Sequence, residues 1–265
     1  MVSILAKPLK KISALAKMKP AIREALMHHW FDSDLGQELL RVERKCLDNI
    51  FKNKLGHHLI QIDSGLYAPL LSNPPIGCCT LYSQQENRAP CPLVRGVPEQ
   101  LPFKPDSIDH IILHHTLDFC EAPYQTVREA SIALMPNGHL VVVGFNPASL
   151  WLARKLRGTL ISQVPWIGRF IRAGRVAEWL ELLNLEVVEQ YSLMHRPAFT
   201  RASTLRRFNW FDRAFRVLLP RAGAVYILVA QKRVAGLIHR NFEWLPQSSP
   251  KSPITAPEIN SPKDV

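Results

Sequence analysis

The chain lacks any apolar run that approaches the roughly 18 residues needed to cross a bilayer, so no transmembrane segment is expected. It also lacks the regular cysteine spacing of a disulfide scaffold. Its five cysteines are odd in number and irregularly placed, and the adjacent pair Cys78 and Cys79 is a poor start for a tetrahedral metal site. With no sustained apolar core of the kind found in signal peptides, we expect reduced thiols, a cytoplasmic location and no bound metal.

The two ends of the chain differ in composition from the middle. Residues 1–29 form a basic extension, in which residues 1–23 hold six Lys and Arg and no acid. Apolar residues could line one side of a helix there, so peripheral contact with an anionic membrane is one prediction and a frayed extension is the alternative. Residues 246–265 contain five prolines and four serines and are predicted to be disordered.

The net charge of +11 is unevenly distributed along the chain. Residues 151–240 carry 16 Lys and Arg against 5 Asp and Glu, whereas the remaining charges balance. A basic surface there favours an anionic partner such as RNA, a nucleotide, a phospholipid head group or an acidic metabolite. Residues 201–216 interleave arginines with aromatics, which suits phosphate binding and base stacking. They equally fit a solvated helix face whose phenylalanines point inward, and no RNA-binding motif accompanies the charge.

The most informative segment of the chain spans residues 101–150. Residues 108–113 are an apolar run too short for a helix, as expected of a strand buried on both faces. A helix is predicted for residues 123–135, an Asn-Gly turn follows it, and residues 139–145 are again rich in β-branched residues. A strand, a helix and a parallel strand form the crossover unit of an α/β sheet.

Particular residues in this segment follow a family pattern. They include the LPF turn at residues 101–103, Asp109 at the start of the strand at residues 108–113, then His115, and the PNGHL turn at residues 136–140. In these features the segment resembles the second half of a class I S-adenosylmethionine-dependent methyltransferase of the type 11 group. Fainter similarities extend the resemblance over residues 30–235, to a bacterial branch of that family.

The resemblance implies an α/β, Rossmann-like fold. Its seven-stranded sheet would be mostly parallel, with an antiparallel last strand and helices on both faces. The methyltransferase-like domain would cover residues 30–240, with a core at 55–150, a substrate cover at 151–180 and the last strands at 186–235. The implied cofactor is S-adenosyl-L-methionine.

The first strand of this family ends in a glycine-rich loop, roughly D-x-G-x-G-x-G, whose glycines let the backbone approach the cofactor. In this sequence Gln61 stands in the place of the carboxylate, Asp63 and Tyr67 occupy glycine positions, and Gly65 is the glycine that is kept. A turn with positive φ would have to tolerate a side chain at those positions, which Asp does better than Tyr. This departure leaves open whether the branch binds the cofactor in an altered way or has lost the chemistry.

Two further cofactor contacts are altered. The strand near residues 78–82 should end in an acidic residue for the ribose hydroxyls, but Ser83 and Gln84 follow it. Before the LPF turn, Glu99 is the carboxylate nearest to the expected adenine position. The resemblance therefore implies the following cofactor-binding residues: Gln61, Asp63, Gly65, Gln84, Glu99, Leu101 and His115.

Methyl transfer requires in-line placement of the acceptor and a base only if the acceptor must lose a proton. His115 is the candidate catalytic base, because the family carries a His or a similar polar residue there and a neutral imidazole accepts protons near pH 7. Its alternative role is to hydrogen-bond the loop beneath the cofactor. His114 should point the opposite way, by strand alternation.

Polar and aromatic residues after the last strand of the segment are candidates for substrate contact, since ligands of open α/β sheets bind beyond the carboxyl ends of the strands. These candidates are Asn146, Trp151 and Arg154. The alternative for Asn146 is that it caps a helix that begins at Pro147.

The sequence thus predicts an S-adenosylmethionine-dependent methyltransferase that acts on a small or anionic acceptor. The competing hypothesis is a catalytically inactive scaffold of the same fold, which binds RNA or a protein partner through its basic C-terminal half. Cofactor binding separates the two hypotheses, because the enzyme must bind S-adenosylmethionine and the scaffold need not.

Overall fold

The computed structural model describes residues 20–84, 91–151, 164–195 and 222–233. All of these residues belong to one compact unit. Several sequence predictions concern residues outside the described ranges: those for residues 1–19, Arg154, residues 201–216 and residues 246–265.

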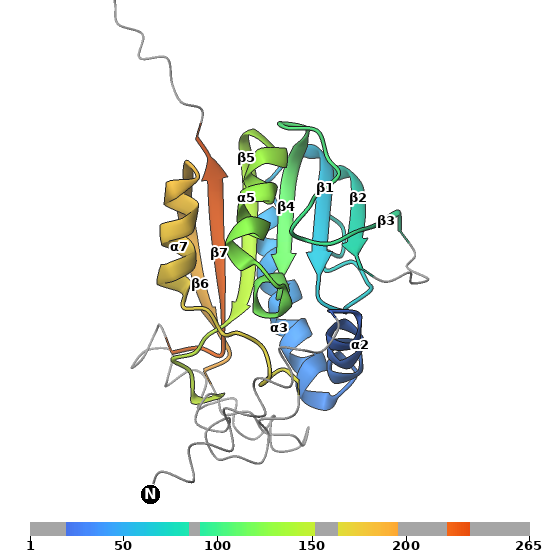
Figure 1. The fold of residues 1–265 in the computed structure, drawn as a ribbon, viewed down its shortest axis with the longest axis vertical. Helices are drawn as coiled ribbons and strands as arrows, with labels where there is room; N and C mark the ends of the chain where they lie inside the picture. The colour runs from blue at the N-terminus through green and yellow to red at the C-terminus, as the bar shows by residue number, and fades with distance from the viewer. Residues whose placement is uncertain (1–19, 85–90, 152–163, 196–221, 234–265) are drawn as a thin grey trace, which may run out of the picture. The chain divides into compact units, whose positions relative to one another are not determined.

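A seven-stranded sheet in the order β3-β2-β1-β4-β5-β7-β6 forms the centre of the molecule (Figure 1). Its strands are β1 (Gly56–Asp63), β2 (Ile76–Ser83), β3 (Leu93–Arg95), β4 (Ile108–His114), β5 (Leu134–Phe145), β6 (Leu185–Leu193) and β7 (Val225–Lys232). Strands β1 to β5 run parallel to one another, and β7 is antiparallel to both β5 and β6. The predicted fold, mostly parallel with an antiparallel last strand, is confirmed.

Helices cover both faces of the sheet. They are α2 (Pro20–Phe31), α3 (Asp34–Phe51), the short α4 (Thr116–Phe119), α5 (Pro123–Ala133) and α7 (Ala173–Leu182). On one face α3 packs against inward side chains such as Ile112, and on the other α5 and α7 pack against Ile111 and Leu113. Successive side chains of β4 thus pack into two different hydrophobic cores, one on each face of the sheet. This alternation is expected of a strand that is buried on both faces.

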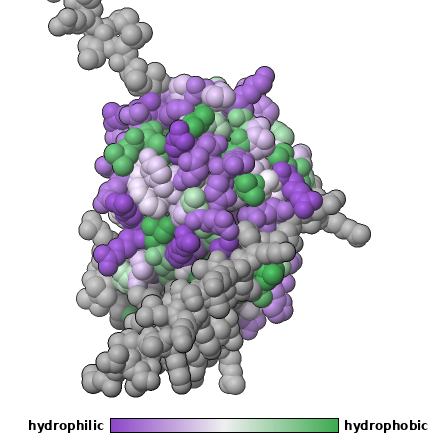
Figure 2. Space-filling view, viewed as in Figure 1, coloured by the Kyte–Doolittle hydropathy of each residue, from purple (hydrophilic) through white to green (hydrophobic). Residues whose placement is uncertain are grey.

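The outer surface of the helical layer is mixed. On the face shown in Figure 2 hydrophilic side chains cover most of the coloured surface, and hydrophobic ones are scattered among them. Helix α7 illustrates the pattern, since Val176 and Leu180 are buried whereas Leu182 is exposed. Among the described residues, no helix combines the length and the apolar character needed to span a membrane.

The strand, helix and strand predicted within residues 101–150 are confirmed, with small differences at their ends. Helix α5 stops at Ala133, two residues before its expected end, because Leu134 already pairs with Ile108 of β4. The left-handed residue of the following turn is Asn137, with φ of 65°. Pairing between the strands therefore decides where the helix ends.

Helix α2 crosses the boundary that the sequence suggested at residue 29. Met27 and Phe31 on this helix are buried in the core that α3 also lines. Residues 20–29 therefore belong to the folded domain, because their apolar side chains have surface to bury. In Figure 1 α2 lies just beyond the ends of β1 and β2, where the arrowheads point.

A glycine at the end of β1 allows α2 to approach the sheet. Gly65 has φ of 109°, which side chains rarely adopt, and a Cβ atom there would lie 2.2 Å from the carbonyl oxygen of Glu24. His28, one turn further along α2, donates a hydrogen bond from Nδ1 to the Gly65 carbonyl oxygen at 3.0 Å. Gly65 thus fixes the distance between the helix and the loop after β1.

We expect Gly65→Ala to lower the free energy of unfolding by about 2 kcal/mol or more, because the backbone conformation is strained for alanine and α2 must shift. Gly174→Ala is the matched control, since a Cβ atom there meets nothing within 4 Å. Urea unfolding of both variants measures the difference. Equal stability of the two variants would contradict this account of Gly65.

Candidate functional site

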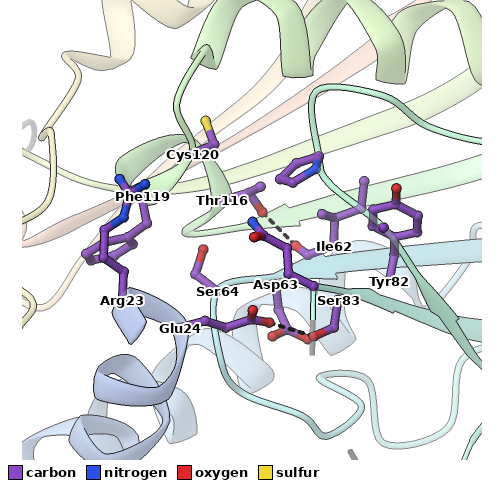
Figure 3. Close-up of a pocket in the computed structure, with 13 residues that line it drawn as sticks. Arg23, Glu24, Ile62, Asp63, Ser64, Tyr82, Ser83, Thr116, Phe119 and Cys120 are labelled. Carbon is purple, nitrogen blue, oxygen red and sulfur yellow. Dashed lines mark hydrogen bonds between the residues drawn. The ribbon is translucent and has the colours of Figure 1, made fainter. Parts of the chain in front are cut away.

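A small cavity lies at the carboxyl ends of β1, β2 and β4, where open α/β sheets bind their ligands (Figure 3). Its wall includes Asp63 and Ser64 after β1, Ser83 at the end of β2 and Thr116 after β4. Helix α2 closes it with Arg23 and Glu24. The cavity encloses about 20 Å³, which is room for roughly one water molecule.

Asp63 shapes the loop after β1. Its Oδ1 accepts hydrogen bonds from the backbone N–H groups of Gly65 at 2.8 Å and Leu66 at 2.9 Å. This carboxylate holds the tight turn, in which Tyr67 takes a left-handed conformation with φ of 55°. The other oxygen, Oδ2, is buried and has no hydrogen-bond partner among the described residues. Burial raises the pKa of Asp63, against the lowering effect of the backbone hydrogen bonds.

Gln61 stabilises a later part of the same loop through two hydrogen bonds. Its Nε2 donates to the carbonyl oxygen of Ala68 at 2.9 Å, and its Oε1 accepts from the backbone N–H of Leu70 at 2.9 Å. The amide serves both bonds because it is donor and acceptor at once, which a carboxylate is not. Gln61 does not line the cavity, and Gly65 lies behind the wall rather than on it.

A carboxylate from α2 reaches the end of β2. Glu24 Oε1 accepts a hydrogen bond from Ser83 Oγ at 2.5 Å, drawn as a dashed line in Figure 3. Glu24 Oε2 is buried without a hydrogen-bond partner among the described residues, and the residue is 5% exposed. Burial raises the pKa of Glu24 to about 7, and the nearby charge of Asp63 acts in the same direction.

The other predicted cofactor residues lie in different surroundings. Gln84 lines the cavity, and its carbonyl oxygen accepts from Arg95 Nε at 3.1 Å. Glu99 instead accepts from the backbone N–H of Glu121 at 2.7 Å, just before α5, and is not part of the wall. Leu101 is buried in the core beneath α5.

His115 lies beside the cavity but its ring does not line it. The ring is fully buried, with Nδ1 3.1 Å from Asp118 Oδ2 and Nε2 3.0 Å from Glu43 Oε1. His114 Nε2 lies 3.0 Å from the other oxygen of Glu43. The expectation that the two histidines point opposite ways is therefore wrong. His115 has φ of 52°, and this left-handed residue breaks the alternation of the strand.

In this buried cluster the pKa of His115 is raised and the pKa of Glu43 is lowered. Burial opposes a charge on His115, but Glu43 and Asp118 outweigh it and raise the pKa of the imidazole. Burial likewise opposes a charge on Glu43, and the charge on His115 together with two hydrogen bonds lowers the pKa of that carboxyl. The side chains of Glu43, His115 and Asp118 form a buried carboxylate, imidazolium and carboxylate chain, called here the charge chain.

Two of the predicted substrate residues, Asn146 and Trp151, also lie away from the cavity. Asn146 donates from Nδ2 to the carbonyl oxygen of Gly223 at 2.9 Å and accepts from the backbone N–H of Ala148 at 3.0 Å. It therefore closes a turn at residues 147–149, and the helix starts only at Leu150. Trp151 is 1% exposed and packs among aromatic rings, including Phe145.

Sequence reasoning missed the part of the wall that α2 supplies. Arg23 and Glu24 were assigned to a basic extension, because nothing in their spacing indicates that the helix folds back over the sheet. One signal was present, since Glu24 is the first acidic residue of the chain and ends the basic run. Thr116 and Cys120 were missed because they follow β4 in a short helix without a motif of their own.

Comparison with known proteins agrees with this geometry. Residues 71–142 match the model of a methyltransferase domain. The Escherichia coli (strain K12) protein YafS is 30% identical over 212 residues, which cover 78% of this chain and 82% of YafS. The chain belongs to the class I methyltransferase family.

Solved methyltransferases share the fold at low sequence identity. A SAM-dependent methyltransferase from Thermotoga maritima is 16% identical with a TM-score of 0.52, and the match covers 77% of this chain and 93% of that one. A SAM-dependent methyltransferase from Archaeoglobus fulgidus is 13% identical with a TM-score of 0.50, covering 74% and 97%. S-adenosylmethionine is the cofactor for which both of these solved proteins are named.

The donor and acceptor groups of the cavity suit this cofactor. S-adenosylmethionine carries hydroxyl and ammonium donors, and the cavity of the methyltransferase offers two buried carboxylate oxygens, on Glu24 and Asp63, that accept no hydrogen bond from the described part of the chain. Its size does not suit it in this closed arrangement, since the space holds roughly one water molecule.

Removing Glu43 should destabilise the methyltransferase by about 3–5 kcal/mol, because the charge on His115 would remain buried without its main partner. We expect this loss for Glu43→Gln, and within about 0.5 kcal/mol of no change for Glu178→Gln, an exposed glutamate paired with Arg175. Chemical unfolding at pH 6 measures both. A change below about 1 kcal/mol for Glu43→Gln would contradict the charge chain.

The loss should also depend on pH. The lowered pKa of Glu43 makes its contribution complete above the ordinary value of 4.5, and it is lost as pH falls below that value. The raised pKa of His115 makes its contribution complete below 6.5, and it is lost as pH rises. The difference in stability between wild type and Glu43→Gln should therefore be largest between pH 4.5 and 6.5, which unfolding curves across pH 4–9 would test.

Proposed function

We propose that this protein transfers a methyl group from S-adenosylmethionine to a small or anionic acceptor, with the cofactor held in the cavity beneath α2. The observation that carries the proposal is the cavity itself, which lies at the carboxyl ends of β1, β2 and β4 and has two buried carboxylates in its wall. Buried carboxylates without full hydrogen bonding are costly to keep, and such groups concentrate at functional sites.

Several residues of the cavity wall would hold the cofactor, each in a different way. Asp63 and Glu24 accept hydrogen bonds, and Ser64 and Gln84 offer further polar groups. Thr116 fixes the floor, since its Oγ1 donates to the carbonyl oxygen of Ile62 at 2.7 Å. When bound, the cofactor supplies an electrophilic methyl group on a sulfonium. The protein then needs only to align the acceptor and to exclude water.

The role of His115 as a general base stays a prediction. Both of its ring nitrogens are engaged by carboxylates, which suits a residue that holds the loop beneath the cofactor. As a base it would need a free nitrogen within hydrogen-bond reach of the acceptor.

The charge of the chain supports an anionic acceptor. The chain has 33 basic and 22 acidic residues. The excess of basic residues comes from residues 151–240, which follow β5. An excess of positive charge on the protein would raise the local concentration of an acidic substrate. Of the proposed substrate contacts, Trp151 and Arg154 belong to the start of that region, and Asn146 precedes it in the sequence.

A catalytically silent scaffold that binds RNA or a protein is the second candidate. The small volume of the cavity favours it, because a scaffold needs no space for a cofactor. The altered loop after β1, with Asp63 and Tyr67 at glycine positions, is compatible with it as well.

Calorimetric titration with S-adenosylhomocysteine, the demethylated product, decides between the two candidates. We expect a dissociation constant on the order of micromolar for the wild type, equivalent to about −8 kcal/mol. Gly65→Arg should abolish binding, because a side chain there collides with the backbone of α2. Gly174→Arg is the matched control, at a glycine with open space around it.

Circular dichroism must show that each variant is folded before its titration is interpreted. If the folded wild type releases no heat at millimolar ligand, the methyltransferase proposal fails and the scaffold is favoured. If Gly65→Arg binds as tightly as Gly174→Arg, the cofactor lies elsewhere than in the cavity.

A further inference from the structure

The end of β2 lacks the acidic residue that nucleotide-binding α/β folds place there. In such folds that carboxylate accepts hydrogen bonds from the ribose hydroxyls. Here β2 ends at Ser83 and Gln84 follows, and both residues line the cavity. Neither side chain carries a charge, so a ribose at this position would lack its usual acceptor.

Glu24 supplies a carboxylate at the same place from a different element. Its Oε1 accepts from Ser83 Oγ at 2.5 Å, so the carboxyl group lies at the very end of β2. Figure 3 shows the side chain of Glu24 extending from α2 across the cavity to Ser83. The helix precedes the first strand in the chain, but the fold brings it to the position where the acid of β2 would stand.

The carboxylate of Glu24 keeps one oxygen without a close hydrogen-bond partner in the described part of the chain, although the backbone of Gln84 lies near enough to lower its pKa. Oε2 has no hydrogen-bond partner among the described residues, and the residue is 5% exposed. Burial and the nearby Asp63 both raise the pKa of Glu24, to about 7, so keeping a charge there opposes folding. A group that only tied α2 to β2 could be neutral, since an amide accepts from Ser83 equally well.

We infer that Glu24 is the residue that binds the ribose hydroxyls of S-adenosylmethionine, in place of an acidic residue at the end of β2. The inference rests on the function proposed above. The second buried carboxylate does not compete for this role, because Asp63 lies at the end of β1 and one of its oxygens already holds the loop.

The test compares two ligands on two proteins. S-adenosylhomocysteine and its 2′,3′-dideoxy analogue are titrated calorimetrically into the wild type and into Glu24→Gln, which keeps the size and the hydrogen bond to Ser83. Glu24→Gln should bind S-adenosylhomocysteine roughly 10- to 100-fold more weakly, the equivalent of one or two hydrogen bonds to a charged group. Its affinity for the dideoxy analogue should stay within about threefold of the wild type.

Each other outcome has a distinct meaning. Wild type that binds neither ligand would remove the proposed function itself. Wild type that binds S-adenosylhomocysteine, with Glu24→Gln binding it equally well, would overturn the inference and leave the function intact. Equal weakening for both ligands would also overturn it, because the carboxylate would then act on another part of the cofactor or on the shape of the site.

Thermal unfolding provides a second readout and a check of folding. Without ligand at pH 8, Glu24→Gln should unfold roughly 2–4 °C higher than the wild type, because a buried charge is removed. Glu178→Gln, an exposed glutamate on α7, is the control and should change neither binding nor Tm. A lower Tm for Glu24→Gln would mean that the carboxylate serves as a structural tie, and would count against a ligand-binding role.

Discussion

A buried charge chain holds together the end of the sheet on which the site is built. Glu43 on α3 contacts His115 after β4, and His115 contacts Asp118 in α4. Asp118 Oδ2 also accepts from the backbone N–H of Phe145 at the end of β5. Because no water reaches these charges, each must keep its partner, and one arrangement of α3, β4, α4 and β5 satisfies them all. This arrangement fixes the positions of the elements that form the cavity wall.

Much of the architecture followed from local patterns, whereas the site did not. The apolar runs at β4 and β5 could be read directly, because strands buried on both faces carry no polar residues at regular positions. The direction of His115 could not, since one left-handed residue turns its ring to the same face as that of His114. Such a conformation depends on contacts with Glu43, which is distant in sequence. The role of α2 was hidden for the same reason, because only tertiary contacts place Glu24 at β2.

The two carboxylates of the site come from different elements, one from β1 and one from the helix that precedes it in the sequence. Asp63 comes from β1 itself, and Glu24 from a helix that precedes it, so the two carboxylates meet only when the domain is folded. Their proximity and burial oppose stability, which is common where a protein keeps unpaired polar groups for a ligand. Polar contacts that hold α2 over the cavity include His28 with Gly65, Glu24 with Ser83, and Arg23 with Glu121 at 3.5 Å. Apolar packing holds the same helix, since Met27 and Phe31 are buried in the core.

Cys120 also lines the cavity, and its surroundings bear on the fate of a reactive methyl group. A sulfonium methyl is attacked readily by a thiolate, which is the reactive form of cysteine. Burial raises the pKa of Cys120 to about 12, and its Sγ donates a weak hydrogen bond to the carbonyl oxygen of Leu117 at 3.8 Å. At neutral pH the sulfur therefore stays protonated. A cofactor bound in the cavity, as proposed above, would therefore lie beside an unreactive thiol, and its methyl group would be left for the acceptor.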